Sequence, residues 1–215
     1  MKYYILTWTV NKKVIGYYPQ TVGNECIDEN GDLPPYAKGY ITNEEFPDPL
    51  TNFNFEMHKR AKLTDLVDAS NISARGLLVS EKMKNIISEF NILNHKFYPA
   101  NLEFKGETLR YYWLHIVNTT LEGIDFLNSN FIEVGYTRRK EKDVEINSHE
   151  EYDRITCDMM IDCDKIVLQP SFKEYDLFFF PCISSDLFAS DRLINALKAN
   201  KITGIEIEES DICDE

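Results

Sequence analysis

The sequence is poor in the residues that form nucleotide-binding loops. Its 215 residues include nine glycines, and the closest two, Gly16 and Gly23, lie seven positions apart. A phosphate-binding loop or a dinucleotide fingerprint needs glycines at shorter spacing, so both are excluded. The G-x-S-x-G pattern that presents a nucleophilic serine is also missing. These absences remove the nucleotide-binding proteins and serine hydrolases that depend on such motifs.

Patterns for metal ligands and disulfides are lacking as well. The five cysteines form no C-x-x-C pair, and the four histidines form no H-x-x-x-H or H-E-x-x-H pair. The sequence therefore predicts neither a zinc site nor a disulfide framework. An odd number of widely spaced cysteines is typical of reduced thiols in a cytosolic protein. We expect no bound metal and no cofactor.

Long apolar runs are absent too. No stretch approaches the roughly 20 apolar residues that span a bilayer. The apolar segment 1–10 is too short for a signal peptide and has no small-residue cleavage site. We therefore expect a cytoplasmic protein with no membrane partner.

Acidic residues are abundant and unevenly distributed. The net charge is −13, and residues 141–164 hold nine acids but only two bases, Lys142 and Arg154. Residues 206–215 hold six acids and no base. This charge predicts repulsion from nucleic acids and attraction to basic partners. A solvated face followed by a frayed tail explains the same pattern equally well.

Several segments have the residue pattern of β-strands. Residues 3–10 are rich in aromatic and β-branched side chains, and residues 14–18 are expected to pair with them across a short turn. The run 108–117 is apolar on both faces, which is typical of a central strand. Further strands are expected at 131–137, 165–169 and 176–180, and the proline-rich stretch 19–55 is expected to be an irregular loop.

Two segments share the pattern of a strand followed by a serine-capped helix. In residues 77–97, Ser80 is a good N-cap, and apolar residues then recur at the spacing of one buried helical face. Residues 187–207 repeat this pattern, with Ser190 at the matching position. An internal duplication and the shared constraints of two amphipathic helices both explain the match. A third, short helix is expected after Ser148, where Ser148-His149-Glu150-Glu151 fits a capping box.

Strands outnumber helices and often follow one another directly. This order predicts an α+β fold, in which a mainly antiparallel or mixed sheet packs against a few helices. No linker is evident, so residues 1–215 are expected to form a single domain. Within it, residues 1–60 could form an N-terminal strand and loop region and residues 61–215 the main body.

The residues offer no specific catalytic pattern. His115 lies within the aromatic strand and is interpreted as a buried, hydrogen-bonded structural histidine rather than a general base. The pairs Glu150-Glu151 and Asp162/Asp164 could act as acid and base or bind a divalent ion. A solvated acidic face explains these carboxylates equally well.

Several short motifs, in this order and spacing, resemble a bacterial family first catalogued as a domain of unknown function. They are Ala61-Lys62-Leu63-Thr64-Asp65-Leu66, Gly76-Leu77-Leu78-Val79-Ser80-Glu81-Lys82-Met83, Tyr111-Tyr112-Trp113-Leu114-His115, and the segment that runs from Ala189-Ser190-Asp191-Arg192-Leu193 to Ile202-Thr203-Gly204-Ile205. That family was later grouped, as the myxobacterial-type immunity domain, with the immunity proteins of polymorphic toxin systems.

The resemblance implies a non-catalytic protein that binds a cognate protein toxin and blocks it. It supplies no catalytic residues to carry over. If the toxin is basic, clustered carboxylates suit such a partner, and the acidic residues expected to contact it are Glu150, Glu151, Asp153, Glu206, Glu208, Glu209 and Asp211. The alternatives are an enzyme with a carboxylate site and a structural or adaptor protein of a mobile element.

Overall fold

The computed structural model describes residues 1–27, 42–47, 52–70, 75–137, 139–181, 183 and 186–213. Within these ranges the chain forms three sheets and a few short helices, so the predicted α+β class is confirmed. Residues 28–41 and 48–51 of the predicted loop 19–55 lie outside the described residues.

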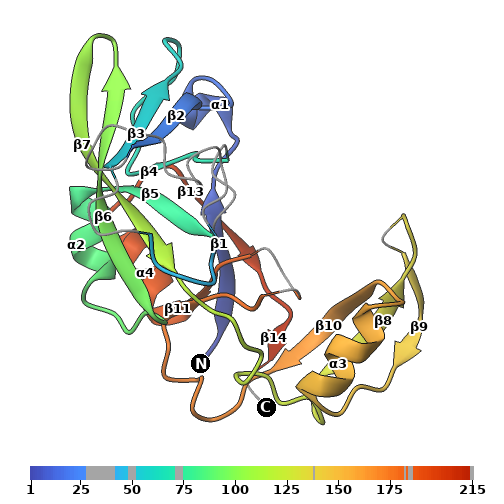
Figure 1. The fold of residues 1–215 in the computed structure, drawn as a ribbon. Coiled ribbons are helices and arrows are strands. Elements are labelled where there is room, and N and C mark those ends of the chain that lie inside the picture. Colours follow the sequence, from blue (N-terminus) through green and yellow to red (C-terminus); the bar gives the residue numbers. More distant parts are fainter. Residues whose placement is uncertain are drawn as a thin grey trace.

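The largest sheet has six strands and curls around its own apolar face (Figure 1). Its strand order is β2 (Thr21–Ile27), β3 (Asn52–Met57), β6 (His95–Phe104), β7 (Glu107–Ile116), β5 (Gly76–Ser80) and β4 (Leu66–Val67). Neighbouring strands are antiparallel except β3 and β6, which run parallel. The predicted central strand is confirmed, because β7 lies between β6 and β5 and pairs along its whole length.

The second sheet joins segments from both ends of the chain. Its strand order is β11 (Leu177–Phe178), β12 (Phe188–Ser190), β1 (Tyr3–Trp8) and β13 (Ile205–Glu209), all antiparallel. The third sheet has the order β14 (Ile212–Cys213), β10 (Ile161–Val167), β8 (Asn130–Val134) and β9 (Lys140–Val144). Figure 1 shows this third sheet and helix α3 (His149–Thr156) beside the other two sheets.

Two halves of the molecule share one spatial order of strands. The strand order β4-β5-β7-β6 in the first sheet has the same antiparallel pairing as β11-β12-β1-β13 in the second. Helix α2 (Glu81–Ile87) follows β5, and helix α4 (Asp191–Ala199) follows β12. This agreement extends the similarity of residues 77–97 and 187–207 to whole units, and it supports an internal duplication. Strand β1 occupies in the second half the place that β7 has in the first.

The matching positions also make matching hydrogen bonds. The hydroxyl of Ser80 donates to Asp65 (2.8 Å), and the hydroxyl of Ser190 donates to Asp176 (2.5 Å). Asp65 directly precedes the edge strand β4, and Asp176 directly precedes the edge strand β11. The hydroxyl of Tyr111 donates to the carbonyl before Asp65, and that of Tyr3 to the carbonyl before Asp176. Burial raises the pKa of both tyrosines to about 12. The two halves therefore share one buried polar motif.

Each aspartate also binds the other half. The backbone N–H of Asn91, which follows α2, donates to Asp176 (3.0 Å), and the N–H of Thr203, which follows α4, donates to Asp65 (3.0 Å). The approach is close at Gly204, where φ is +84° and an added Cβ would lie 2.2 Å from the Leu66 carbonyl oxygen. The two halves are thus joined by reciprocal hydrogen bonds as well as by apolar contacts.

Apolar packing forms two buried clusters. One lies inside the curl of the six-stranded sheet and includes Phe53, Phe55, Tyr98 and Trp113. The other lies between the helices and the sheets and continues into the third sheet, where Tyr152 of α3 packs near Phe126 and Phe131. These clusters bury large aromatic side chains, which are a major source of core stability.

Two expectations were wrong. Residues 14–18 do not form a strand, because helix α1 occupies Lys12–Ile15. The side chain of Asn11 accepts a hydrogen bond from the N–H of Lys13 and so caps this single turn. The stretch 19–55 is not irregular throughout, since it contains β2 and the start of β3.

The helix caps predict a graded loss of stability. Ser80 and Ser190 each accept a hydrogen bond from the third residue of their helix (3.2 and 3.1 Å), but Ser190 is fully buried. We expect Ser80→Ala to lower the free energy of unfolding by about 1 kcal/mol and Ser190→Ala by about 2 kcal/mol, because the latter also strips a partner from a buried carboxylate. Urea unfolding of both variants measures the difference. If both variants lost the same free energy of unfolding, the burial of Ser190 would not add to the cost of its removal.

Candidate partner-binding surfaces

Four of the expected acidic residues follow one another along β13 and the turn after it. Glu208 and Glu209 are exposed, and Glu206 is half-buried on the strand that pairs with β1. Glu209 forms an ion pair with Lys2 (3.1 Å). We call Glu206, Glu208, Glu209 and Asp211 the acidic strip. They follow one another along one short segment, with Glu206 and Glu208 on one face of β13 and Glu209 on the other.

The structure adds carboxylates to one end of the acidic strip. Strand β14 pairs in parallel with β10, and the N–H of Ile166 donates to the carbonyl of Asp211. Burial raises the pKa of Asp211, and repulsion from Asp162, Asp164 and Asp186 raises it further. The predicted pair Asp162/Asp164 therefore lies beside the strip. Among the described residues, no three His, Cys, Asp or Glu side chains are arranged to hold a metal ion.

The other three expected acidic residues lie on α3, which packs on a different sheet. Glu151 is engaged locally, because its carboxylate accepts from the N–H of Asn147 (2.9 Å) and pairs with Arg154 (3.2 Å). The side chain of Ser148 accepts from the N–H of Glu151, which confirms the predicted helix start. Asp153 lies 3.6 Å from His149, and Glu150 is exposed. Glu151 thus serves mainly to stabilise α3, whereas Glu150 remains open to a partner.

His115 has the structural role that the sequence predicts. It is fully buried, and its Nδ1 accepts from the indole N–H of Trp113 (3.4 Å) while its Nε2 lies 3.1 Å from the carbonyl of Glu45. The indole can only donate and the carbonyl can only accept, so these partners fit the neutral ring with its proton on Nε2. Burial lowers the pKa of His115 to about 4. The ring therefore anchors residues 42–47 onto the six-stranded sheet.

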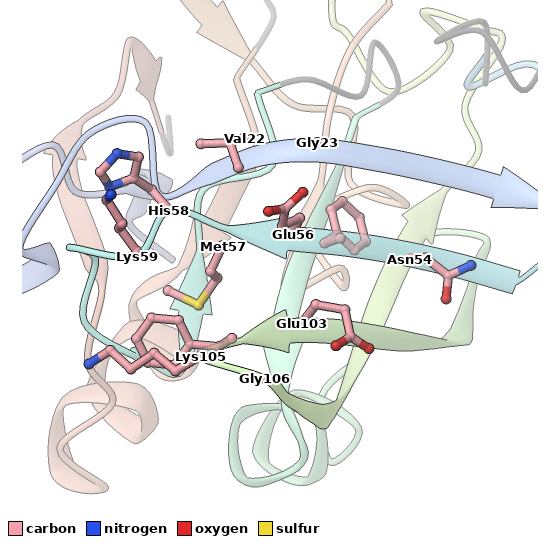
Figure 2. A pocket seen from close by; sticks show the side chains of 12 residues that line it. Val22, Gly23, Asn54, Glu56, Met57, His58, Lys59, Glu103, Lys105 and Gly106 are labelled. Carbon is pink, nitrogen blue, oxygen red and sulfur yellow. The ribbon is translucent and has the colours of Figure 1, made fainter.

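A cleft of about 720 Å³ opens where β3 ends beside the β6–β7 turn (Figure 2). Its lining comes from three places in the chain, namely Val22 and Gly23, Asn54 to Lys59, and Glu103 to Gly106. Its volume lies within the range of clefts that bind small ligands.

The cleft has an acidic end and a basic end. The parallel pairing of β3 with β6 places Glu56 opposite Glu103, but the Glu56 carboxylate leans toward Gly23 on β2 and that of Glu103 accepts from the Thr108 hydroxyl on β7. Both strands continue into basic residues, His58 and Lys59 after β3 and Lys105 after β6. Figure 2 shows Lys59 and Lys105 at one end of the cleft and Glu103 toward the other. A parallel register thus gives both walls the same charge order.

Apolar groups lie between the charged ends. Val22 is 50% exposed, and Phe104 is half-buried with the ammonium of Lys105 4.6 Å from its ring centre. Gly23 leaves space beside Glu56, because an added Cβ would lie 3.8 Å from a carboxylate oxygen of Glu56, at ordinary contact distance. The cleft is therefore partly apolar, and the lack of a side chain at Gly23 leaves it open on that side.

Sequence reasoning did not find this cleft. Glu56 and Glu103 are 47 positions apart, and only the parallel pairing of β3 and β6 brings them together. A local signal existed in the repeated order of acid then base in Glu56-Met57-His58-Lys59 and Glu103-Phe104-Lys105. That order indicates a shared charged site only once β3 and β6 are known to be neighbouring strands.

The acidic strip, the carboxylates of α3 and the charged cleft are thus the charged surfaces described on this α+β fold. None of the helices in the described part of the chain has the length and apolar character needed to cross a membrane. The sequence matches a family model, described as Immunity protein family (Imm11), over residues 2–211. Because the match covers nearly the whole chain, the protein belongs to this family. A search of curated protein sequences gives no significant match.

Proposed function

We propose that this protein neutralises a cognate bacterial toxin by binding directly to it, without catalysis, in the cytoplasm. The observation that carries this proposal is the match to the immunity protein family over residues 2–211. Its setting would be a polymorphic toxin system, in which the immunity gene lies directly after the toxin gene. The resemblance noted from the sequence and the family model point the same way.

The charge of the chain suits a basic toxin. The net charge is −13, and the acidic strip with its neighbours Asp162, Asp164 and Asp186 concentrates carboxylates where β14, which follows β13, pairs with β10. Such a surface attracts a basic protein from a distance and repels nucleic acid. We propose the acidic strip, together with Glu150 and Asp153 of α3, as regions that steer the toxin.

Co-expression tests the proposal directly. The toxin domain encoded next to this gene is expressed alone and together with this chain, and growth and co-purification are scored. We expect growth to be restored and the two proteins to purify as a complex. Restored growth without a complex would contradict neutralisation by direct binding, and failure to restore growth would contradict the immunity function.

Electrostatic steering predicts a salt-dependent association rate. Raising the salt concentration from about 50 to about 500 mM is expected to slow association at least tenfold, because exposed charges are screened within a few ångströms. The variant Glu206→Gln/Glu208→Gln is expected to show a shallower dependence. The matched variant Glu150→Gln/Asp153→Asn removes two charges from α3 instead. Stopped-flow rates for the three proteins show which acidic region steers, and a salt-independent rate for the parent chain would refute steering.

One observation favours the enzymatic alternative. Glu56 and Glu103 lie on neighbouring strands that line a cleft large enough for a substrate, and two carboxylates in one cleft are a common acid–base arrangement. If catalysis protected the cell, Glu56→Gln/Glu103→Gln would abolish growth rescue while toxin binding stayed unchanged. Parallel measurement of rescue and affinity separates the two functions.

A further inference from the structure

We infer that one face of the second sheet, where β1 pairs with β13, binds a basic loop segment of the toxin. Four side chains form this face, which we call the β1–β13 face: Ile5, Thr7, Glu206 and Glu208. The inference rests on the proposed function, and it names the residues that the toxin contacts and the kind of segment that contacts them.

The register of the two halves identifies their equivalent positions. Tyr111 on β7 pairs with the cap residue Ser80. Tyr3 on β1 pairs in the same way with Ser190. The match continues past these strands, because β3 pairs in parallel with β6 and β10 pairs in parallel with β14, the strand that follows β13. Positions at equal distances from the two tyrosines can therefore be compared directly.

The first sheet has an equivalent face. Two and four residues after Tyr111 come Trp113 and His115, which lie opposite Tyr98 and Lys96 on β6. The same two steps along β1 lead to the β1–β13 face, where a glutamate of β13 lies opposite each residue of β1. Directly opposed residues and alternate residues of a strand share one face of a sheet. The two faces therefore use the same four positions, with a tyrosine and a lysine where β13 has glutamates.

Residues 42–47 cover this face in the first half. Side chains of the face hold the segment in three pairs, Tyr98–Pro47 (2.7 Å from hydroxyl to carbonyl oxygen), His115–Glu45 (3.1 Å from Nε2 to carbonyl oxygen) and Lys96–Phe46 (4.4 Å from ammonium to ring centre). Two of these contacts reach backbone carbonyls, and the segment contains neither helix nor strand. A face of this kind thus binds an irregular segment of chain.

The β1–β13 face carries no such cover from the described residues. Glu208 is exposed, and Ile5, Thr7 and Glu206 are half-buried. Ile5 and Thr7 also line a cavity of about 270 Å³. Within the described ranges, neither glutamate forms an ion pair, and the hydroxyl of Thr7 forms no hydrogen bond. The positions that hold a segment in the first half are therefore left for a partner in the second.

The charge of the face selects a basic segment. In the first half, Lys96 contacts a segment that contains two acids, Glu44 and Glu45. In the second half, Glu206 takes the place of Lys96, and Glu208 lies about 7 Å further along the same face. A guanidinium or ammonium group from the toxin would form charge-assisted hydrogen bonds with these carboxylates. A second copy of this chain would be repelled, because its net charge is −13.

The test measures association and dissociation rates of the full chain with the toxin domain encoded beside it, by biolayer interferometry. We expect the Glu208→Gln variant to dissociate about tenfold faster, because a hydrogen bond to a charged group is lost from the docked complex. The rates of the parent chain are the reference.

Glu209→Gln is the matched variant. Glu209 is the next residue of β13, so its side chain points to the opposite face, where it pairs with Lys2. Both variants remove one exposed charge from the same strand, and we expect them to slow association to a similar extent. Only Glu208→Gln is expected to speed dissociation more than about twofold. Equal dissociation rates for the two variants would overturn the inference.

A steric variant tests the face without changing charge. Thr7→Phe adds a ring beside the cavity that Thr7 lines, and aromatic residues are well tolerated in strands. We expect dissociation at least tenfold faster, because the ring takes space that the toxin segment needs. The melting temperature of Glu208→Gln is expected to stay within about 2 °C of the parent, as for other surface substitutions. A larger fall would show that this chain itself covers the face, and the toxin assignment would be overturned.

The outcomes separate the inference from the function on which it rests. If the parent chain neither binds nor neutralises the toxin, the proposed function fails. If the parent binds and Glu208→Gln and Thr7→Phe dissociate at the parent rate, only the assignment of the β1–β13 face fails. If the parent is a dimer in solution and Thr7→Phe makes it monomeric, a second copy covers the face and the toxin assignment is overturned.

Discussion

The Asp176→Ala variant is expected to lose about 3 kcal/mol of the free energy of unfolding, because a hydrogen bond to a charged group contributes about 1.5–3 kcal/mol and this carboxylate accepts several. The carboxylate of Asp176 is 4% exposed, and one of its oxygens accepts from both Nη2 (2.9 Å) and Nε (3.1 Å) of Arg192 and from the hydroxyl of Ser190. Its other oxygen accepts from the N–H of Asn91. Replacement by alanine removes every one of these bonds and takes away the acceptor of the buried Ser190 hydroxyl. Urea unfolding measures the loss.

The equivalent place in the other half supplies a matched control for this prediction. There Asp65 accepts from Ser80 and from both donors of Thr203, but no arginine of the described residues pairs with it and it is more exposed. Burial alone would raise the pKa of Asp65, yet these hydrogen bonds outweigh it and lower the pKa. We expect Asp65→Ala to cost about 1–2 kcal/mol. A loss at Asp65 as large as that at Asp176 would show that Arg192 contributes nothing.

Acidification is expected to destabilise the protein through His115 by about 3 kcal/mol between pH 6.5 and pH 4. The pKa of the buried ring is lowered to about 4, whereas the unfolded chain has the ordinary value of 6.5. Between these values the unfolded state binds a proton that the folded state does not, so the free energy of unfolding falls as the pH falls. Above pH 6.5 the contribution is fully present.

The variant His115→Gln isolates this contribution. Glutamine keeps hydrogen-bonding capacity but does not titrate, so its free energy of unfolding should fall less than that of the parent between pH 7.5 and pH 5. Burial also lowers the pKa of His95, which adds to the loss in both proteins and cancels in the comparison. Parallel pH profiles for parent and variant would contradict the assignment of this titration to His115.

Local patterns predicted the elements whose signals lie within a few residues. Ser80 and Ser148 marked the starts of α2 and α3 because an N-cap hydroxyl accepts from a backbone N–H three residues later. The apolar run 108–117 predicted β7, since only a strand covered on both faces buries so many aromatic residues. Helix α1 was missed because Val14 and Tyr17 favour a strand, and one capped turn carries little periodicity.

Pairings between distant segments could not be predicted. The acidic residues 150–153 and 206–211 looked equivalent in the sequence, but they lie on elements of different sheets, and Glu151 is occupied by its own helix start. The cleft was missed for the same reason, because its charge order depends on the register of Glu56 with Glu103. Register is set by packing across the whole sheet rather than by neighbours along the chain.

Strand β1 has a consequence for how the molecule is made. Residues 3–8 are synthesised before every other described strand, yet both strands that flank them, β12 and β13, lie beyond residue 187. The curled half, whose β4, β5, β6 and β7 lie within about 50 residues of one another, can assemble while synthesis continues. The other half must wait for nearly the entire chain, and until then its earliest segment keeps a row of unsatisfied backbone groups that a chaperone would need to shield.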